Sequence, residues 1–238
     1  MSRGTTRLLT LVRWFKRALL AVLTLVLLYE GWLFGWVLWW RTINPDMTRF
    51  MELRLETLRV NDPKAALQQR WVAYEHISPH LKRALIAAED SRFMQHDGFD
   101  WDGIEKALAR NRRRGKIVAG GSTISQQLAK NLLLTPDKTL WRKAQEAVIT
   151  LMIETTWSKH RILEVYLNVI EWGNGIFGAE AAAWHYFGVS ATQLSAEQAA
   201  RLAAMVPRPR YFDAHRTSPI LAARSESIRR HMSAAPIP

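Results

Sequence analysis

An apolar run from Ala18 to Trp40 is the feature that most constrains how this chain folds. The run has 23 residues and one charge, Glu30. A helix rises about 1.5 Å per residue, so this length crosses a hydrocarbon core of roughly 30 Å. Five basic residues precede the run and four tryptophans crowd its C-terminal end. Because positive flanks stay cytoplasmic, we predict a transmembrane helix with the N-terminus inside and the body outside.

A cleaved signal peptide is the alternative interpretation of this run. The run is longer than an ordinary signal-peptide core, and no small-x-small cleavage site follows it. We therefore favour an uncleaved anchor. Glu30 is costly in lipid, which leaves two expectations: it sits away from the bilayer centre, or it meets a partner helix.

The rest of the chain has a helical pattern nearly throughout, from about residue 76 to 206, and it lacks convincing alternating strands. Ser78-Pro79 predicts a helix start, and Asp102 is expected to cap a helix over Gly103–Arg110. The basic run Asn111–Gly115 is predicted as an exposed loop. The glycines between 173 and 178 predict another loop, and Ser195 predicts a capping box with Gln198.

Charge and cysteine content exclude several classes of function. The chain carries a net charge of +12 and no cysteine, so neither disulfides nor thiolate chemistry are available. A basic body suits nucleic acid, an anionic membrane surface or a phosphorylated substrate. No zinc-finger spacing and no phosphate-binding Walker loop is present. We therefore expect no nucleic-acid partner.

A carboxylate pair, Glu89-Asp90, closes an apolar helix and is followed by His96 and Gly98. A carboxylate at such an edge can be partly desolvated, which raises its pKa toward that of a useful general base. The alternative for the pair is a solvated surface position. His96 by itself is more typical of a hydrogen-bonded structural residue than of a catalyst.

A glycine pair, Gly120-Gly121, opens a second segment that suits anion binding. The free N–H groups at a helix start attract phosphate. Beyond the glycines, one polar face is predicted to hold Thr123, Gln126, Gln127 and Lys130, opposite an apolar stripe. An ordinary amphipathic helix with a glycine start explains the same pattern.

Arg142 and Glu146 stand four residues apart, so they share a helix face. A helix salt bridge is the plain interpretation. The functional alternative is an arginine for pyrophosphate oxygens and a glutamate for a divalent cation, of which magnesium suits oxygen ligands. Arg201 is a single charge on a buried helix and should need a partner.

Together these segments resemble the peptidoglycan glycosyltransferases, the polymerases of bacterial cell-wall glycan. The matching motifs are Glu89-Asp90-x-x-Phe93-x-x-His96-x-Gly98, Gly121-Ser122-Thr123-x-x-Gln126-Gln127, Arg142-Lys143-x-x-Glu146 and Lys159-x-x-Ile162-Leu163-x-x-Tyr166-x-Asn168. A fifth motif is approximate: it reads Arg201-x-x-x-Met205-Val206, where the family usually has Val-Leu. The resemblance runs from about 75 to 212. Because the chain ends soon afterwards, it resembles the monofunctional branch, which lacks a transpeptidase domain.

The resemblance implies a mainly α fold: a lysozyme-like helical glycosyltransferase domain with a small membrane-proximal lobe, preceded by one transmembrane helix. The expected divisions are a cytoplasmic basic tail (1–17), the transmembrane helix (18–40), a juxtamembrane connector and small lobe (41–75), the glycosyltransferase domain (76–212) and a C-terminal tail (213–238). The implied place is the inner membrane, with the catalytic domain in the periplasm.

The resemblance also implies a substrate and residue roles. Lipid II, the undecaprenyl-pyrophosphate-linked disaccharide peptide, would be joined to a growing glycan strand. Glu89 would deprotonate the acceptor 4-hydroxyl, and Glu146 would position a magnesium ion or a basic side chain. The implied substrate-binding residues are Asp90, Phe93, His96, Ser122, Thr123, Gln126, Gln127, Lys130, Asn131, Arg142 and Lys143. Other expected partners are the lipid bilayer and cell-wall synthesis or division proteins.

Two rival functions differ in what they need from these residues. A lytic enzyme of lysozyme-like fold needs an acid but no pyrophosphate clamp, so Lys130 and Arg142 argue against it. An inactive membrane-anchored scaffold needs neither Glu89 nor Glu146.

Overall fold

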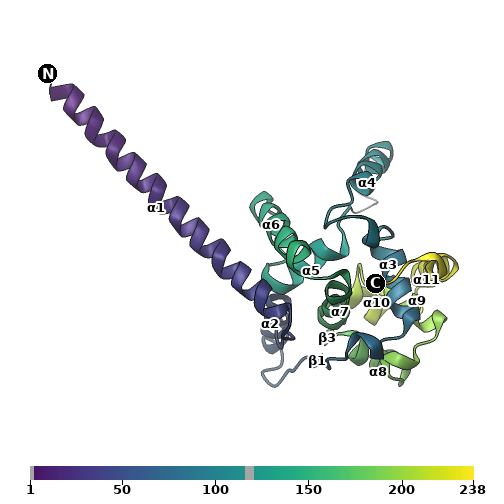
Figure 1. Ribbon diagram of the computed structural model, residues 1–238. Helices are drawn as coiled ribbons and strands as arrows, with labels where there is room; N and C mark the ends of the chain where they lie inside the picture. The colour runs from purple at the N-terminus through teal and green to yellow at the C-terminus, as the bar shows by residue number, and fades with distance from the viewer. Residues whose placement is uncertain (1–2, 116–120) are drawn as a thin grey trace.

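The computed structural model describes residues 3–115 and 121–238, and it is mainly helical as predicted (Figure 1). The helices are α1 (Arg3–Trp40), α2 (Arg49–Arg59), α3 (Pro79–Glu89), α4 (Trp101–Arg114), α5 (Ile124–Leu133), α6 (Leu140–Thr156), α7 (Lys159–Val169), α8 (Ala179–Phe187), α9 (Ala196–Met205), α10 (Pro209–Ala214) and α11 (Pro219–His231). The strands are β1 (Gln68–Gln69), β2 (Glu171–Gly173) and β3 (Ile176–Phe177). Short 3-10 helices are η1 (Tyr74–His76), η2 (Phe93–Gln95), η3 (Ala191–Gln193) and η4 (Met232–Ala234).

Helix α1 projects from the body as a long rod (Figure 1). Its segment Leu11–Trp40 is long and apolar enough to cross a membrane, and only 6% of its most apolar stretch is buried. The last turns are different, because Leu33 and Val37 are buried against the body. The Trp157 indole N–H also donates to the Val37 carbonyl at 2.9 Å. The end of the membrane helix is therefore part of the folded domain.

Glu30, the one charge in the apolar run 18–40, has a hydrogen-bond partner in the same chain. The Gln145 side-chain amide, on α6, donates to Glu30 Oε1 at 2.8 Å. Of the two expectations for Glu30, contact with a partner helix is the one observed, and the partner is α6. This contact ties α1 to the helix that also carries Arg142 and Glu146.

The core brings together helices that are distant in sequence. Helix α3 packs against α9 and α11, and α5 packs against α6, α7 and α2. Capping fixes where these helices begin: Ser78 accepts from the His80 N–H, and Ser195 forms the predicted capping box with Gln198. The apolar stripe of α5 is buried, so its N-terminus and polar face are held in a fixed position beside α3.

The structure contains a small sheet that the sequence pattern does not predict. Its order is β1-β3-β2, with β2 and β3 antiparallel and β1 parallel to β3. The glycine-rich stretch predicted as a loop is the β2–β3 hairpin, whose turn uses Gly175 at φ +76°. Strands of two or three residues are too short to show alternation, which is why the pattern fails here.

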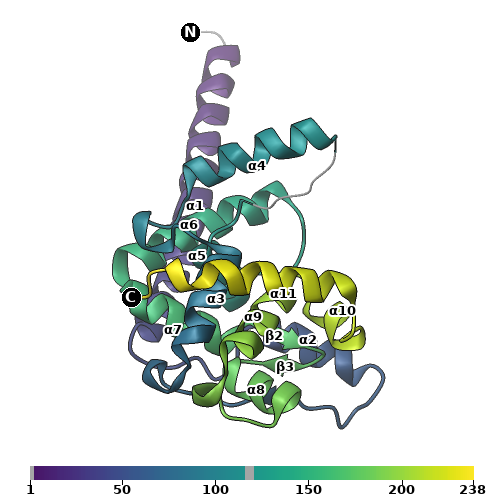
Figure 2. The same ribbon diagram turned by 90° about the vertical axis from the view of Figure 1, so that its right-hand side faces the viewer.

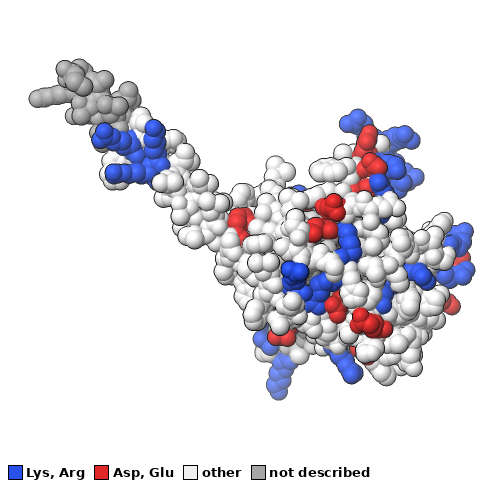
Figure 3. Space-filling model, in the orientation of Figure 1, with Lys and Arg blue, Asp and Glu red and all other residues white. Residues whose placement is uncertain are grey.

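Helix α4 also differs from prediction. Its cap is Asp100, whose Oδ1 accepts the Gly103 N–H at 3.1 Å, whereas Asp102 pairs with Arg92. The basic run predicted as a loop over Asn111–Gly115 instead continues the helix to Arg114, because arginine favours helices. The helix projects from the body and carries a basic tip (Figures 2 and 3).

The segment expected as a C-terminal tail, 213–238, is folded. Helix α11 crosses the body in yellow in Figure 2, and its residues Leu221 and Ile228 are buried. The segment before α11 also supplies the partner predicted for Arg201, which donates to the Arg216 carbonyl at 2.5 Å. The C-terminal helix is therefore part of the core.

Candidate active site

Glu89 ends α3 and lies in the centre of the candidate site. Its Oε2 accepts from the Gln127 amide at 2.9 Å, and its Oε1 accepts from Arg224 Nη2 at 3.3 Å. The Tyr166 hydroxyl in turn donates to Gln127 Oε1 at 2.7 Å, which fixes the orientation of that amide. One carboxylate is thus held directly by side chains from α5 and α11, and Tyr166 of α7 acts on it through Gln127.

Burial dominates the electrostatics of Glu89. Desolvation raises its pKa, although the Gln127 hydrogen bond and the charges of Arg224 and Lys130 act in the opposite direction. A raised pKa brings a carboxylate closer to the value at which it accepts protons near neutral pH. Glu89 therefore has the environment of a general base.

Asp90, Phe93 and His96 hold the site together. Asp90 Oδ2 accepts the Ile124 N–H at 3.0 Å, which ties the end of α3 to the start of α5. Its Oδ1 lies 2.9 Å from His96 Nε2. Only 1% of the Asp90 side chain and 7% of the His96 side chain are exposed, and Phe93 is fully buried. Asp90 also borders a recess beside Glu89, and substrate binding by these three residues stays a prediction.

The start of α5 is built by a capping box. Thr123 accepts from the Gln126 N–H while the Gln126 side chain accepts from the Thr123 N–H, and both side chains are buried. The Thr123 hydroxyl also donates to the Gly98 carbonyl at 2.7 Å. Thr123 and Gln126 therefore fix the start of the helix. Thr123 also borders a recess beside Glu89, and substrate binding by the pair stays a prediction. Gly120 lies outside the described residues.

The remaining polar residues of this helix differ in exposure. Ser122 is exposed and lies 3.4 Å from Lys143 Nζ, whereas Asn131 is buried and donates to the Gln127 carbonyl at 2.7 Å. A recess of about 110 Å³ opens beside Glu89 and is bordered by Asp90, Ser122 and Thr123, among others. Gln127 does not border this recess, but it contacts Glu89 directly.

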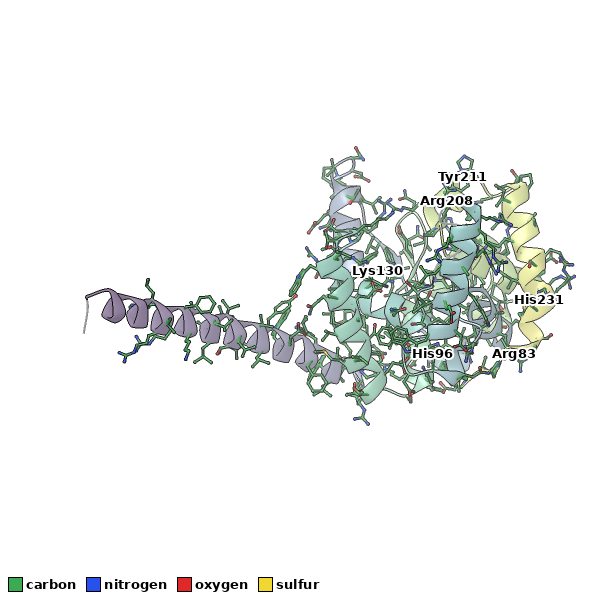
Figure 4. All side chains as sticks on the ribbon, turned by 90° about the horizontal axis from the view of Figure 1, so that it is seen from above. Arg83, His96, Lys130, Arg208, Tyr211 and His231 are labelled. Atoms are coloured by element: carbon green, nitrogen blue, oxygen red, sulfur yellow. The ribbon has the colours of Figure 1, made fainter. Side chains whose placement is uncertain are left out.

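Three cations gather near Glu146, which is buried on α6. Arg142 Nη1 lies 2.5 Å from Glu146 Oε2, and Lys143 pairs with Glu146 Oε1. Lys130, on α5, is part of the same group, because the charges of Glu146, Arg142, Lys143 and Glu89 all act on it. Figure 4 places Lys130 toward the side of the body from which α1 projects.

Lys130 is partly desolvated, and burial lowers its pKa. The charge of Glu146 opposes this effect, while Arg142 and Lys143 add to it. Three cations around one carboxylate leave an excess of positive charge. Such a cluster suits an anion that arrives with at least two charges, such as a pyrophosphate.

The residues around Glu146 do not fit a magnesium site. Both Glu146 oxygens are occupied by cationic side chains. In the described part of the chain, no group of three histidine, aspartate or glutamate side chains is placed to hold a metal ion. Of the two expected roles of Glu146, positioning basic side chains is therefore the one that the geometry supports.

The structure adds residues that sequence reasoning left out of the site. Tyr166 was part of a motif with no assigned role, and it orients Gln127. Arg224 lay in the expected tail, yet it contacts Glu89. No local pattern around Arg224 distinguishes it from the other arginines of α11, so only the fold reveals it.

Known proteins match this chain over most of its length. A family model described as "Transglycosylase" matches residues 56–233. A Biosynthetic peptidoglycan transglycosylase of Dechloromonas aromatica is 60% identical over 95% of this chain and 98% of its own length. A protein of the same name from Azoarcus sp. is 60% identical over 96% of this chain and 99% of its own length. Another, from Chromobacterium violaceum, is 56% identical over 93% of this chain and 97% of its own length.

Proposed function

The chain belongs to the transglycosylase family as a peptidoglycan transglycosylase, and from this we propose that it polymerises lipid II into glycan strands. The observation that carries the proposal is one arrangement of charges. The Glu89 carboxylate lies close enough to Lys130 for that charge to act on its pKa, and Arg142 and Lys143 in turn act on Lys130. A base beside a pyrophosphate-binding cluster is what transfer from a lipid pyrophosphate requires.

In the proposed reaction Glu89 removes the proton from the 4-hydroxyl of the acceptor sugar. The resulting oxygen attacks the anomeric carbon at the end of the growing strand from the face opposite the leaving group. A glycosidic bond forms, the bond from carbon to the pyrophosphate oxygen breaks, and the anomeric configuration inverts. The proton stays on Glu89 until solvent takes it.

The leaving group is undecaprenyl pyrophosphate, on which negative charge grows as the bond breaks. In the proposal Lys130 and Arg142 neutralise this charge and Lys143 adds to the same positive field, which is supported by the mutual effect of these three charges. Cations held in place before the reaction stabilise the transition state without reorganising. Glu146 keeps Arg142 and Lys143 on one side of α6.

The lytic alternative has less support from this geometry. Glycoside cleavage normally uses two carboxyl groups that flank the scissile bond. Here the second carboxylate of the site, Glu146, is buried and paired with two cations. The scaffold alternative gives no reason for a desolvated Glu89. Cell-wall synthesis or division proteins as partners stay a prediction.

Labelled lipid II added to the detergent-solubilised protein distinguishes the three functions. A polymerase converts it to glycan strands. A lytic enzyme leaves it unchanged and cleaves preformed glycan in a parallel reaction, and a scaffold does neither. Strand formation supports the proposal, while cleavage or inactivity overturns it.

The proposed location is the inner membrane, with the N-terminus cytoplasmic and the catalytic domain periplasmic. Arg13, Lys16 and Arg17 stand before the apolar stretch of α1, where Figure 3 shows a basic cluster followed by an uncharged surface. Basic residues near the end of a membrane helix remain on the cytoplasmic side.

Protease added to intact spheroplasts is expected to digest the body, because residues beyond 41 lie outside in this topology. Permeabilised cells, in which both sides are accessible, serve as the control. Protection of the body in intact spheroplasts, with digestion only after permeabilisation, would reverse the proposed orientation.

A further inference from the structure

Helix α11 presents one arginine to the candidate base. Arg224 lies three residues after Leu221 and four before Ile228, so the three share one helix face. Leu221 and Ile228 are buried and α11 packs against α3 and α9, so this face is fixed against the body. Arg224 is thereby held with Nη2 3.3 Å from Glu89 Oε1.

The contact joins residues 135 positions apart and engages Arg224 with little else. In the described part of the chain, Glu89 is the one hydrogen-bond partner found for the Arg224 side chain, and its buried Nε has none. Through this one contact the arginine connects α11 to the end of α3, where Glu89 lies. Its placement is explained by Glu89.

Charged and titratable groups face Glu89 from each helix packed around it. They are Arg224 from α11, Lys130 from α5, Asp90 next in sequence, and Tyr166 from α7 behind Gln127. Lys130 and Arg224 favour the ionised carboxylate, and Asp90 disfavours it. Lys130 also belongs to the cluster around Glu146, so Arg224 is the cation dedicated to Glu89.

We propose that Arg224 is a positioning residue for the reaction, one that fixes the Glu89 carboxylate through Oε1 and keeps it ionised to receive the acceptor proton. The inference rests on the proposed function of Glu89 as general base. A carboxylate oxygen has two lone pairs, so Oε1 and Oε2 can each keep their present partner and still accept a proton. The C-terminal helix thus completes a site whose other residues come from α3, α5, α6 and α7.

The pH dependence of turnover carries the signature of this role. Burial raises the pKa of Glu89 and the charge of Arg224 counteracts that rise. Without Arg224 the pKa rises further, so more base is protonated at a given pH. Activity that depends on ionised Glu89 is then lost at a higher pH as the solution is acidified.

The test compares kcat and KM for lipid II across pH in the full-length wild type, Arg224→Gln, Arg224→Lys and Arg229→Gln. Arg229 is the matched control, because it lies on the same helix but pairs with exposed Glu226. The acid limb of the profile is the pH range in which kcat/KM falls as the solution is acidified. We expect Arg224→Gln to shift this limb to higher pH by about one unit and to lower kcat about tenfold or more. Arg224→Lys keeps the charge and should keep the limb, with a smaller loss of kcat.

The outcomes separate this proposal from the function on which it rests. If wild type and Arg229→Gln make no polymer, the proposed function fails. If they polymerise and folded Arg224→Gln has the wild-type acid limb and kcat, the positioning role is overturned. A lower melting temperature in Arg224→Gln with an unchanged limb would also overturn it, since that result describes a purely structural contact.

Discussion

Replacing Glu89 by glutamine is expected to abolish polymerisation, with a loss of about 100-fold or more, the usual contribution of a general base. Glutamine has the same shape and still accepts the Gln127 amide hydrogen bond, but it cannot take the acceptor proton. The rate of strand formation from lipid II measures the effect. Exposed Glu105→Gln, on α4, is a control for the chemical change alone.

The same substitution makes a prediction about stability. The pKa of Glu89 is raised by folding, so its contribution to stability is present at low pH and lost as the pH rises through the folded value. At neutral pH the buried carboxylate therefore works against folding. Folded Glu89→Gln should melt no lower than wild type. Polymer formation within about tenfold of wild type by this variant would remove Glu89 from the role of base.

Loss of either cation that faces the leaving group is expected to reduce turnover strongly. One charge-assisted hydrogen bond contributes about 1.5–3 kcal/mol, so Lys130→Ala and Arg142→Ala should each reduce kcat by roughly 10- to 200-fold. Arg142→Lys should recover part of the loss, because an ammonium cannot replace the guanidinium fork. Turnover of lipid II at saturating substrate is the measurement.

Stability measurements distinguish this effect from a simple helix salt bridge. Arg142→Ala leaves Glu146 with Lys143 as its partner, so the fold should persist. Exposed Arg112→Ala, on α4, is a control for lost positive charge. Near-normal turnover of lipid II by both alanine variants would contradict the proposal that these cations bind the pyrophosphate. A lytic function would then again be an alternative.

The features that sequence reasoning predicts correctly are local in origin. The apolar run defines α1, and Ser78 and Ser195 mark the starts of α3 and α9, because these features depend on residues within a few helical turns. Even within a motif, though, spacing does not say which side chain is buried. Thr123 and Gln126, for example, match the spacing of a capping box, and that spacing alone is the sequence signal for the buried start of α5.

Other features depend on tertiary contacts that no local pattern carries. An arginine on an amphipathic helix is usually solvated, and the sequence around Arg224 does not show that α11 packs on α3 and brings this side chain to Glu89. The sequence of α1 likewise does not show that Gln145 lies beside Glu30. In both cases the partner is more than a hundred residues away in sequence, and only the folded core brings the two together.

The most direct test of the account counts two products of one reaction. Purified full-length protein is given lipid II labelled in both the disaccharide and the lipid, with Glu89→Gln run in parallel. We expect one undecaprenyl pyrophosphate released for each new glycosidic bond, inverted anomeric configuration in the strand, and neither product from the variant. Retained configuration, strand growth without release of the lipid pyrophosphate, or equal products from Glu89→Gln would contradict the account.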